Sequence, residues 1–585
     1  MIVFFIYRKH KKCILSGWAM ERFHTVICIL LLIFRIPYLI PGIAMKRPPL
    51  KIRAKAVLLG LPILLGLYAP LAAQNILIDN LSNPEEVSIA MSRKNPLLLV
   101  AGSNIDNYYY SHDGGITWVR NTLTSASGVW GDPMVMCDTA GDFYYFHLAC
   151  PGGQWWDSPN FLDRVVCQKS VDEGITYTGD YYMGQQNAGK IEDKAWACVD
   201  PHTNYLYCTW TEDDHYDGIP AGYVVNGQDS SRILFSSSQN GGLTWSPAIP
   251  VSSYDGNCVD SDSTDEGAVP CVGPNGEVYV VFSLGNSILF NRSTNHGASW
   301  MTQNSLVNSQ VGGWDLNVSG FYRTNGMTVS ACDLSNSPYH GTIYVNWSDI
   351  RNGAGDPDIF ICKSTNGGIT WSAPVRVNQD TTHTAQFNNW MCVDQKTGYV
   401  YVVYLDRSLH PGSDSTDVFL AMSADGGQSF TTQKINTQTF LPDVSVFPGD
   451  YINVTGYNGT VHAIWTRVDP GMTSIWTNTS HFTPLGAGAP ASYPGDLRLS
   501  APMPNPVSGP TWLQYIAPAN ETCSMEVWSV TGQHEGNVFT NRTAAPGWQG
   551  VSFNPAGLGL QAGTYLLVLQ AAAGERAVQR MVYIK

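Results

Sequence analysis

The sequence predicts an all-β protein, and three observations support this prediction. Short runs of β-branched and aromatic residues alternate with Gly, Asn and Asp turns through most of the chain. An eight-residue turn motif recurs six times, and a pattern of paired strands recurs with it. The composition agrees, because only 14% of the 585 residues are charged while Gly (56), Trp (18) and Tyr (29) are abundant.

The first 73 residues are expected to lie outside the fold. The segment from Met45 has a basic start and an apolar run, and it ends in Leu71-Ala72-Ala73, which is typical of a secretory signal peptide. We therefore assign residues 45–73 to that peptide, with cleavage after Ala73. Residues 1–44 contain a second apolar run, and they are either the result of a start codon assigned too early or a membrane segment. Export permits disulfides, and Cys150–Cys167 and Cys258–Cys271 are the first pairs to test.

The recurring turn has the pattern Ser-x-Asp/Asn-x-Gly-x-Thr/Ser-aromatic. Its six copies begin at Ser111, Ser170, Ser238, Ser293, Ser364 and Ser423. Their spacing of 55–71 residues fits one four-stranded sheet with its loops, so the sequence predicts a ring of such sheets, a β-propeller. In each turn the Asp or Asn can accept hydrogen bonds from nearby amides, the Gly permits a positive φ, and the aromatic ring packs beneath.

A polar start followed by two strands forms a second repeat. Its seven copies open at Glu85, Asp132, Asp193, Asp265, Asn325, Asn389 and Asp450. Seven such hairpins favour seven blades, with residues 75–80 as the outer strand that closes the ring; six blades is the alternative. Five cysteines recur on these inner strands, and free thiols in small core positions are favoured over bridges. They are Cys137, Cys198, Cys271, Cys332 and Cys392.

The repeated turn resembles the Asp box of sialidases and related bacterial neuraminidase-repeat proteins, and the resemblance covers about residues 75–485. It implies a sialidase-like propeller over residues 74–488, with the boxes on the face away from the ligand. The ligand is then expected at the opposite end of the blades, where the inner strands begin and the second strands end. We call this end the top face.

Residues 489–585 differ in composition and predict a small antiparallel β-sandwich. A Pro-Asn-Pro motif, a strand over 525–533, the strand AGTYLLVLQ over 562–570 and a final strand ending in Lys585 follow in order. This order resembles the C-terminal sorting domain of type IX secretion substrates. The resemblance implies contact with that secretion machinery and a secreted or outer-membrane surface location in a Bacteroidetes-type bacterium. A carbohydrate-binding or spacer sandwich is the alternative.

Carboxylates crowd the predicted top face, and neighbouring carboxyl groups raise one another's pKa, as a general acid/base pair requires. Sialidases use a Tyr nucleophile assisted by a Glu, a separate Asp acid/base and three arginines. The resemblance implies that Glu266 and Tyr451 correspond to the Glu and the nucleophile, and Asp193 and Asp265 are further candidate catalytic residues. The candidate substrate-binding residues are Arg351, Arg407, Arg467, Asp132, Asp450 and Trp390. Further tryptophans assigned to this face, which would stack on sugars, are Trp130, Trp155, Trp156 and Trp314.

The arginine triad is not visible in the sequence. The motif Phe34-Arg35-Ile36-Pro37 lies ahead of the signal peptide, and the first inner strand opens with Glu85-Glu86 instead. The sequence therefore favours a secreted or cell-surface propeller that binds an extracellular glycan, glycoprotein or other protein partner. A glycoside hydrolase of sialidase-like type is the alternative.

The acidic balance bears on partners and cofactors. The net charge of −14 argues against nucleic acid, and the chain is expected to be monomeric. Asp260, Asp262 and Asp265 place oxygen ligands close together in sequence, which suits a structural Ca²⁺, although a solvated acidic turn explains them too. No cofactor is expected to be required.

Overall fold

The computed structural model describes residues 75–153, 160–185, 189–216, 223–482, 497–499, 502, 507–509, 511–517, 521–544, 549–572, 574 and 576–584. The segments assigned to residues 1–44 and 45–73, together with Trp155, Trp156 and Lys585, lie outside this set. Regular structure in the described residues is almost entirely β-strand, with two 3₁₀ turns, η1 (Pro151–Gly153) and η2 (Pro555–Leu558). The prediction of an all-β protein is confirmed. In these residues no helix is long and apolar enough to cross a membrane.

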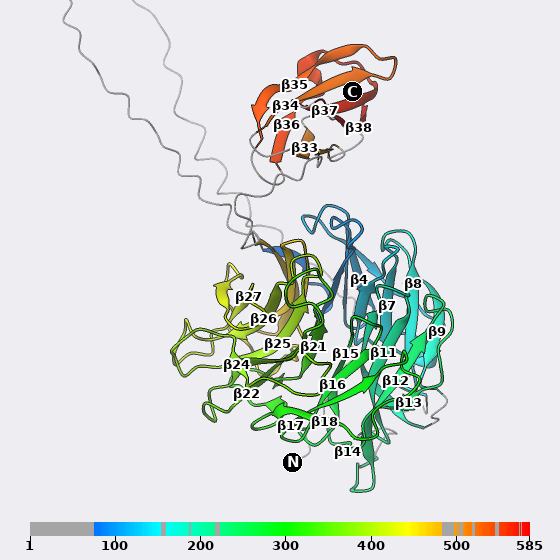
Figure 1. Ribbon diagram of the computed structural model, residues 1–585, viewed down its shortest axis with the longest axis vertical. Coiled ribbons are helices and arrows are strands. Elements are labelled where there is room, and N and C mark those ends of the chain that lie inside the picture. The colour runs from blue at the N-terminus through cyan, green and yellow to red at the C-terminus, as the bar shows by residue number, and fades with distance from the viewer. Residues whose placement is uncertain are drawn as a thin grey trace, which may run out of the picture. The chain divides into compact units, whose positions relative to one another are not determined.

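Seven antiparallel sheets follow one another along residues 76–481 of the described chain (Figure 1). The first contains β2 (Ser88–Met91), β3 (Leu99–Ser103), β4 (Asn107–Ser111) and β5 (Val119–Thr122). The second contains β6 (Met134–Cys137), β7 (Phe143–Leu148), β8 (Val165–Ser170) and β9 (Thr178–Met183). The third contains β10 (Ile191–Val199), β11 (Leu206–Asp213), β12 (Ser230–Ser238), β13 (Ile249–Pro250) and the added β14 (Gly256–Asn257).

The remaining sheets continue this order. The fourth contains β15 (Glu266–Val272), β16 (Val278–Leu284), β17 (Ser287–Ser293) and β18 (Ser305–Ser309). A ribbon of β19 (Asp315–Leu316) and β20 (Thr324–Asn325) precedes the fifth, which contains β21 (Val329–Cys332), β22 (Ile343–Asp349), β23 (Asp358–Ser364) and β24 (Val375–Arg376). The sixth contains β25 (Gln386–Val393), β26 (Val400–Asp406), β27 (Asp417–Ser423) and β28 (Thr431–Lys434). The seventh contains β29 (Asn453–Tyr457), β30 (Thr460–Asp469), β31 (Met472–His481) and β1 (Ile76–Asp79).

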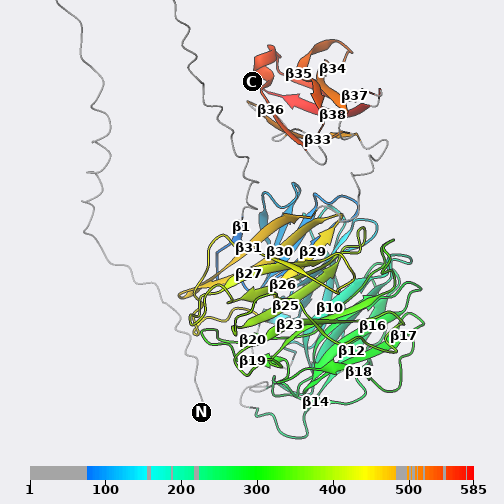
Figure 2. The same ribbon diagram turned by 60° about the vertical axis from the view of Figure 1, so that its left-hand side comes forward.

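The first strands of these sheets contact one another in a closed circle, from β2 through β6, β10, β15, β21 and β25 to β29, which contacts β2 again. The circle of sheets is the arrangement of a β-propeller. Strand β1 pairs with β31, with Ile76 opposite Thr477, so the start of the described chain supplies the outer strand of the last sheet, as predicted. Figure 2 shows β1, β31, β30 and β29 side by side.

The second strand of most sheets carries a large aromatic ring into the core. Phe146, Trp210, Phe282, Trp347, Tyr404 and Trp465 are each at most 2% exposed. Burying a large side chain stabilises the folded state by about 1.5–3 kcal/mol, so these recurring rings hold neighbouring sheets together.

The six Asp boxes form nearly identical turns. In every copy the Ser hydroxyl accepts a hydrogen bond of 2.9 Å from the amide of the box Gly. That Gly has a φ between +75° and +87°, which a side chain would strain. In the first box, Asp113 accepts hydrogen bonds from the amide and the hydroxyl of Thr117.

The strand register separates these turns from the top face. In the third sheet, Ser238 of the box pairs with Leu206 at the start of β11, whereas Ile191 at the start of β10 pairs with Asp213 at the end of β11. The box turns and the starts of the inner strands therefore lie at opposite ends of the sheet.

The C-terminal part contains a three-stranded and a four-stranded antiparallel sheet. The strands are β32 (Arg498–Leu499), β33 (Thr511–Ile516), β34 (Thr522–Ser529), β35 (His534–Thr543), β36 (Gln549–Phe553), β37 (Gly563–Ala571) and β38 (Arg576–Tyr583). Side chains such as Leu513, Met525 and Leu567 form a separate apolar core.

Candidate functional site

The top face of the propeller holds a cluster of charged side chains at the starts of the inner strands. Several of these starts are bulged, with register shifts after Asp193 and Glu266. At the bulges the backbone is left-handed at Lys194 (φ +46°) and Gly267 (φ +73°). A β-bulge re-aims side chains, and the left-handed conformation at Lys194 is one that residues other than Gly rarely adopt. The bulge at Lys194 places its side chain in the middle of the cluster.

Lys194 is 4% exposed and lies among carboxylates from three sheets. Its Nζ is 2.9 Å from Asp193, 3.5 Å from Asp450, 3.7 Å from Glu266 and 4.0 Å from Asp260. Despite burial, which opposes the charge, these carboxylates hold the pKa of Lys194 well above its usual value. The ammonium group therefore stays charged and joins the sheets electrostatically.

Arg323 supplies the second cation of the cluster. Its guanidinium bonds both oxygens of Asp260, at 2.6 and 3.2 Å, and Asp450 at 2.8 Å. Tyr216 also donates to Asp260, at 2.8 Å. Although burial opposes it, Lys194 and Arg323 lower the pKa of Asp260, so this carboxylate is ionised and fully engaged.

Three further carboxyl groups, those of Glu85, Glu86 and Asp132, form what we call the carboxyl corner. Asn104 connects them: its Nδ2 donates to Glu86 at 2.6 Å and to Glu85 at 3.4 Å, and its Oδ1 accepts from the amide of Asp132 at 2.8 Å. The amide of Asp450 donates to Glu86 at 3.2 Å. Glu86 is buried, whereas Glu85 and Asp132 are partly exposed.

The carboxyl corner holds protons near neutral pH. Burial raises the pKa of Glu85 to about 8, and burial followed by the charge of Asp450 raises the pKa of Glu86 to about 7. Burial and the charge of Glu86 also raise the pKa of Asp132 well above its usual value, and the two carboxyl groups are hydrogen-bonded to each other. A pair of carboxyls sharing a proton in this way can donate and accept protons near pH 7.

Tyr451 lies between this cluster and two indole rings. Its ring centroid is 4.8 Å from that of Trp196 and 6.5 Å from that of Trp390. Burial, and then the charges of Asp132 and Glu86, raise the pKa of the Tyr451 hydroxyl, which is therefore protonated at neutral pH.

The structure thus brings together five of the sequence-predicted residues around Lys194 and the carboxyl corner: Asp132, Asp193, Glu266, Asp450 and Tyr451. Asp265 is placed elsewhere, because its carboxylate accepts from the amide of Gly256 and the hydroxyl of Ser231. Trp390 contacts Trp196 with ring centroids 4.3 Å apart. Trp314 is fully buried and offers no ring face for a sugar, whereas Trp130 is partly exposed and packs edge-on against Phe161.

The three predicted arginines form ion pairs with acids close to them in sequence, and none of their described contacts reaches Lys194 or the carboxyl corner. Arg351 pairs with Asp349. Arg407 pairs with Asp414 at 3.2 Å and stacks between Phe321 and Phe387. Arg467 pairs with Asp469 at 2.8 Å. No arginine triad is formed by these residues.

The three carboxylates considered for Ca²⁺ point to different partners. Asp260 bonds Arg323, Asp262 accepts from the amide of Asp315 at 2.8 Å, and Asp265 faces Gly256. Within the described ranges, no group of three or more His, Cys, Asp or Glu side chains is arranged to hold a metal ion.

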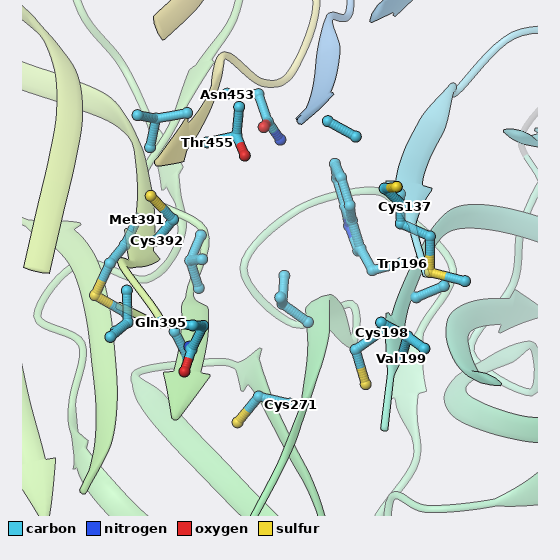
Figure 3. Close-up of a pocket in the computed structure, with 18 of the residues that line it drawn as sticks. Cys137, Trp196, Cys198, Val199, Cys271, Met391, Cys392, Gln395, Asn453 and Thr455 are labelled. Carbon is cyan, nitrogen blue, oxygen red and sulfur yellow. The ribbon is translucent and has the colours of Figure 1, made fainter. Parts of the chain in front are cut away.

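A cavity of about 260 Å³ lies inside the ring of inner strands (Figure 3). Trp196 and Trp390 line it together with the five repeated cysteines, and Figure 3 shows Cys137, Cys198, Cys271 and Cys392 among the lining residues. All eleven cysteines in the described residues have free thiols, so neither pair singled out from the sequence is bridged in this structure. Burial raises the pKa of Cys271 to about 12, which makes it a weak nucleophile.

Sequence reasoning missed three residues of the site. Lys194 stands directly after the predicted Asp193. The available signal was a single lysine among seven strand starts that open with acids or amides. Arg323 lies two residues before the fifth repeat start, outside the pattern. Asn104 is in the loop between β3 and β4, where no repeat marks it.

Comparison with known proteins agrees with the repeat. The family model of the BNR/Asp-box repeat matches residues 109–120, which contain the first box. No curated protein sequence matches.

Among solved structures, the Hadza microbial sialidase Hz136 is 12% identical over 66% of this chain and 73% of that chain, with a TM-score of 0.36. A polysaccharide lyase of family PL25, an ulvan lyase, is 10% identical over 70% and 96%, with a TM-score of 0.42. The α-L-arabinanase of Penicillium chrysogenum is 13% identical over 62% and 97%, with a TM-score of 0.34. At such low identities these similarities do not carry an activity over to this chain.

Proposed function

We propose that this protein is a secreted or cell-surface, seven-bladed, sialidase-like propeller whose top face binds extracellular glycans. The closed circle of seven sheets supports the blade number. The carboxyl corner with Asn104 carries the binding proposal, because it offers protonated carboxyls as donors and an amide and carboxylates as acceptors. Sugar hydroxyls both donate and accept hydrogen bonds, so they match this set.

The charges argue that the glycan carries no carboxylate. Both cations of the cluster, Lys194 and Arg323, already contact two or more carboxylates. An anionic sugar would therefore meet the carboxyl corner, which has no ion pair within the described residues, and be repelled. Like charges placed together at an interface cost several kcal/mol. Sialosides are expected to bind far more weakly than uncharged glycans.

A glycan panel tests this proposal with the full chain. Binding to non-sialylated glycans that is lost in Glu86→Gln supports it. The matched control is Asp113→Asn in the first box, because three other boxes already contain Asn at this position. If no glycan of the panel binds, the proposal is wrong.

Glycoside hydrolysis is a second candidate, favoured by one observation. The carboxyls of Glu86 and Asp132 lie near Tyr451, and a carboxyl with a pKa of about 7, as that of Glu86 has, can protonate a leaving oxygen. Release of reducing sugar that disappears in Glu86→Gln and Tyr451→Phe would establish this activity. Glycan binding without release of reducing sugar would favour the non-catalytic glycan-binding propeller.

We further propose that residues 489–585 form a sandwich-like sorting domain for type IX secretion. The separate core of its two sheets supports an independent unit. In a Bacteroidetes-type host, deletion of this segment is expected to keep the propeller inside the cell. Normal export of the shortened chain would contradict the assignment.

A further inference from the structure

The carboxyl corner contains three carboxyl groups, and neither cation of the cluster forms an ion pair with any of them. The ion pairs of Lys194 go to Asp193, Asp260, Glu266 and Asp450, and those of Arg323 go to Asp260 and Asp450. In the described part of the chain no ion pair reaches Glu85, Glu86 or Asp132. This corner of the top face therefore lacks a counter-charge.

One atom beside the corner also lacks a partner. Asp450 is 4% exposed, and its Oδ2 contacts Lys194 and Arg323. Its Oδ1 is buried and accepts no hydrogen bond from the described residues. A buried acceptor without a donor costs about 1–3 kcal/mol, so a ligand that brings a donor gains at this point. Asp450 borders the corner directly, because its amide bonds Glu86.

We infer that the carboxyl corner receives the protonated amine of an amino sugar, so that the preferred ligand is a glycan with free, non-acetylated amino groups. This inference rests on the proposed glycan-binding function and names its substrate class. An ammonium group carries three N–H donors and no acceptor, which suits a corner of three carboxyls. Glu85 and Asp132 are partly exposed and give the amine access from solvent, while Asn104 holds the carboxyls in place.

Protons occupy the corner in the absence of such a ligand. The charged groups that face Glu85 and Glu86 are Asp132, Asp450 and Lys194, and the two acids outnumber the single cation. A bound ammonium replaces a proton, so binding releases protons and strengthens as the pH rises from 5 towards the pKa of the sugar's own amine. A neutral sugar that accepts hydrogen bonds from the protonated carboxyls would bind more weakly over the same range.

Calorimetry of the full chain with matched oligosaccharides tests the inference. A glucosamine oligomer is expected to bind at least about tenfold tighter at pH 7 than the N-acetylglucosamine oligomer of the same length, which corresponds to one added ion pair. Glu85→Gln and Glu86→Gln are expected to remove this difference, whereas Asp113→Asn preserves it. Below the pKa of its amine, the glucosamine oligomer is expected to gain affinity as the pH rises from 5, by up to about tenfold per pH unit.

The outcomes separate this inference from the function on which it rests. Equal or tighter binding of the acetylated oligomer, or an affinity of the glucosamine oligomer that falls as the pH rises from 5 towards the pKa of its amine, overturns the amino-sugar assignment while glycan binding stands. Failure of every glycan of the panel to bind overturns both. The pH series uses the unmodified protein, so it decides the question even if a Gln variant does not fold.

Discussion

The two ends of each blade are built on different rules. At one end the Asp boxes repeat the same turn six times, with the same Ser–Gly hydrogen bond and the same left-handed Gly. At the other end the seven inner strands open with different residue pairs, and only one opening, Asp193-Lys194, contains a cation. Repetition serves the fold, and the departures from it form the candidate site.

The difference also appears in how each end uses charge. The carboxylate of Asp113 is satisfied within its own turn and depends on no other blade. Lys194, by contrast, contacts carboxylates of the fourth and seventh sheets and of the loop before the fourth. A change in a box should therefore act locally, and a change in the cluster should act on several blades at once.

Replacement of the central cation gives the largest expected effect. Lys194→Met leaves buried carboxylates without their counter-charge, and breaking a buried ion pair costs about 3–5 kcal/mol. The free energy of unfolding from urea titration, followed by tryptophan fluorescence, measures this loss. Lys94→Met is the control, because Lys94 is exposed and bonds only the carbonyl of Ala140. Equal stability of the two variants would mean that the top-face cluster is no more than a solvated surface.

The pH dependence of stability gives the second effect. The pKa of Glu86 is about 7 in the folded protein against an ordinary 4.5, so the folded chain keeps a proton that the unfolded chain releases. The contribution of Glu86 to the free energy of unfolding is therefore largest below about pH 4.5, falls as the pH rises to about 7, and is constant above that. Glu86→Gln is expected to flatten the slope by about 1.4 kcal/mol per pH unit between pH 5 and 7. An unchanged pH dependence of the free energy of unfolding would mean that a group other than Glu86 holds the proton.

The contrast between the two ends explains what the sequence could predict. The boxes and the seven strand starts repeat, so the all-β class, the ring and the pairing of residues 75–80 with the last sheet could be predicted from spacing alone. The grouping of Asp193, Glu266, Asp450 and Tyr451 followed from the same repeat. The roles of Arg323 and Asn104 could not be predicted, since both lie in loops whose course depends on contacts with other blades. The destinations of Arg351, Arg407 and Arg467 depended on acids two to seven residues away, which satisfy them locally.

Loss of a box carboxylate gives a smaller effect. Asp113→Ala removes the acceptor of four short-range hydrogen bonds, comparable to the loss of a helix N-cap, and is expected to cost about 0.5–2 kcal/mol. Asp113→Asn is expected to stay within about 0.5 kcal/mol of the unmodified protein. Asn366→Ala in the fifth blade shares no partner with Asp113, so urea titration of the double variant should give the sum of the two losses. A loss well above that sum would show that the boxes are coupled and would weaken the contrast with the cluster.

The cysteines give the smallest expected effect, because five of them repeat like the boxes but carry no hydrogen-bond network of comparable extent. Burial raises the pKa of Cys258 and of Cys271 to about 12, so at pH 8 both thiols are expected to react with iodoacetamide far more slowly in the folded than in the denatured protein. Mass spectrometry after denaturation without reductant is expected to find all eleven thiols of residues 75–584 alkylated. Recovery of a disulfide-linked Cys258–Cys271 or Cys150–Cys167 peptide pair would contradict this expectation. A covalent link would then join parts of the fold that are held here by packing alone. The repeated inner strands would in that case differ from one another, as the residues at their starts do.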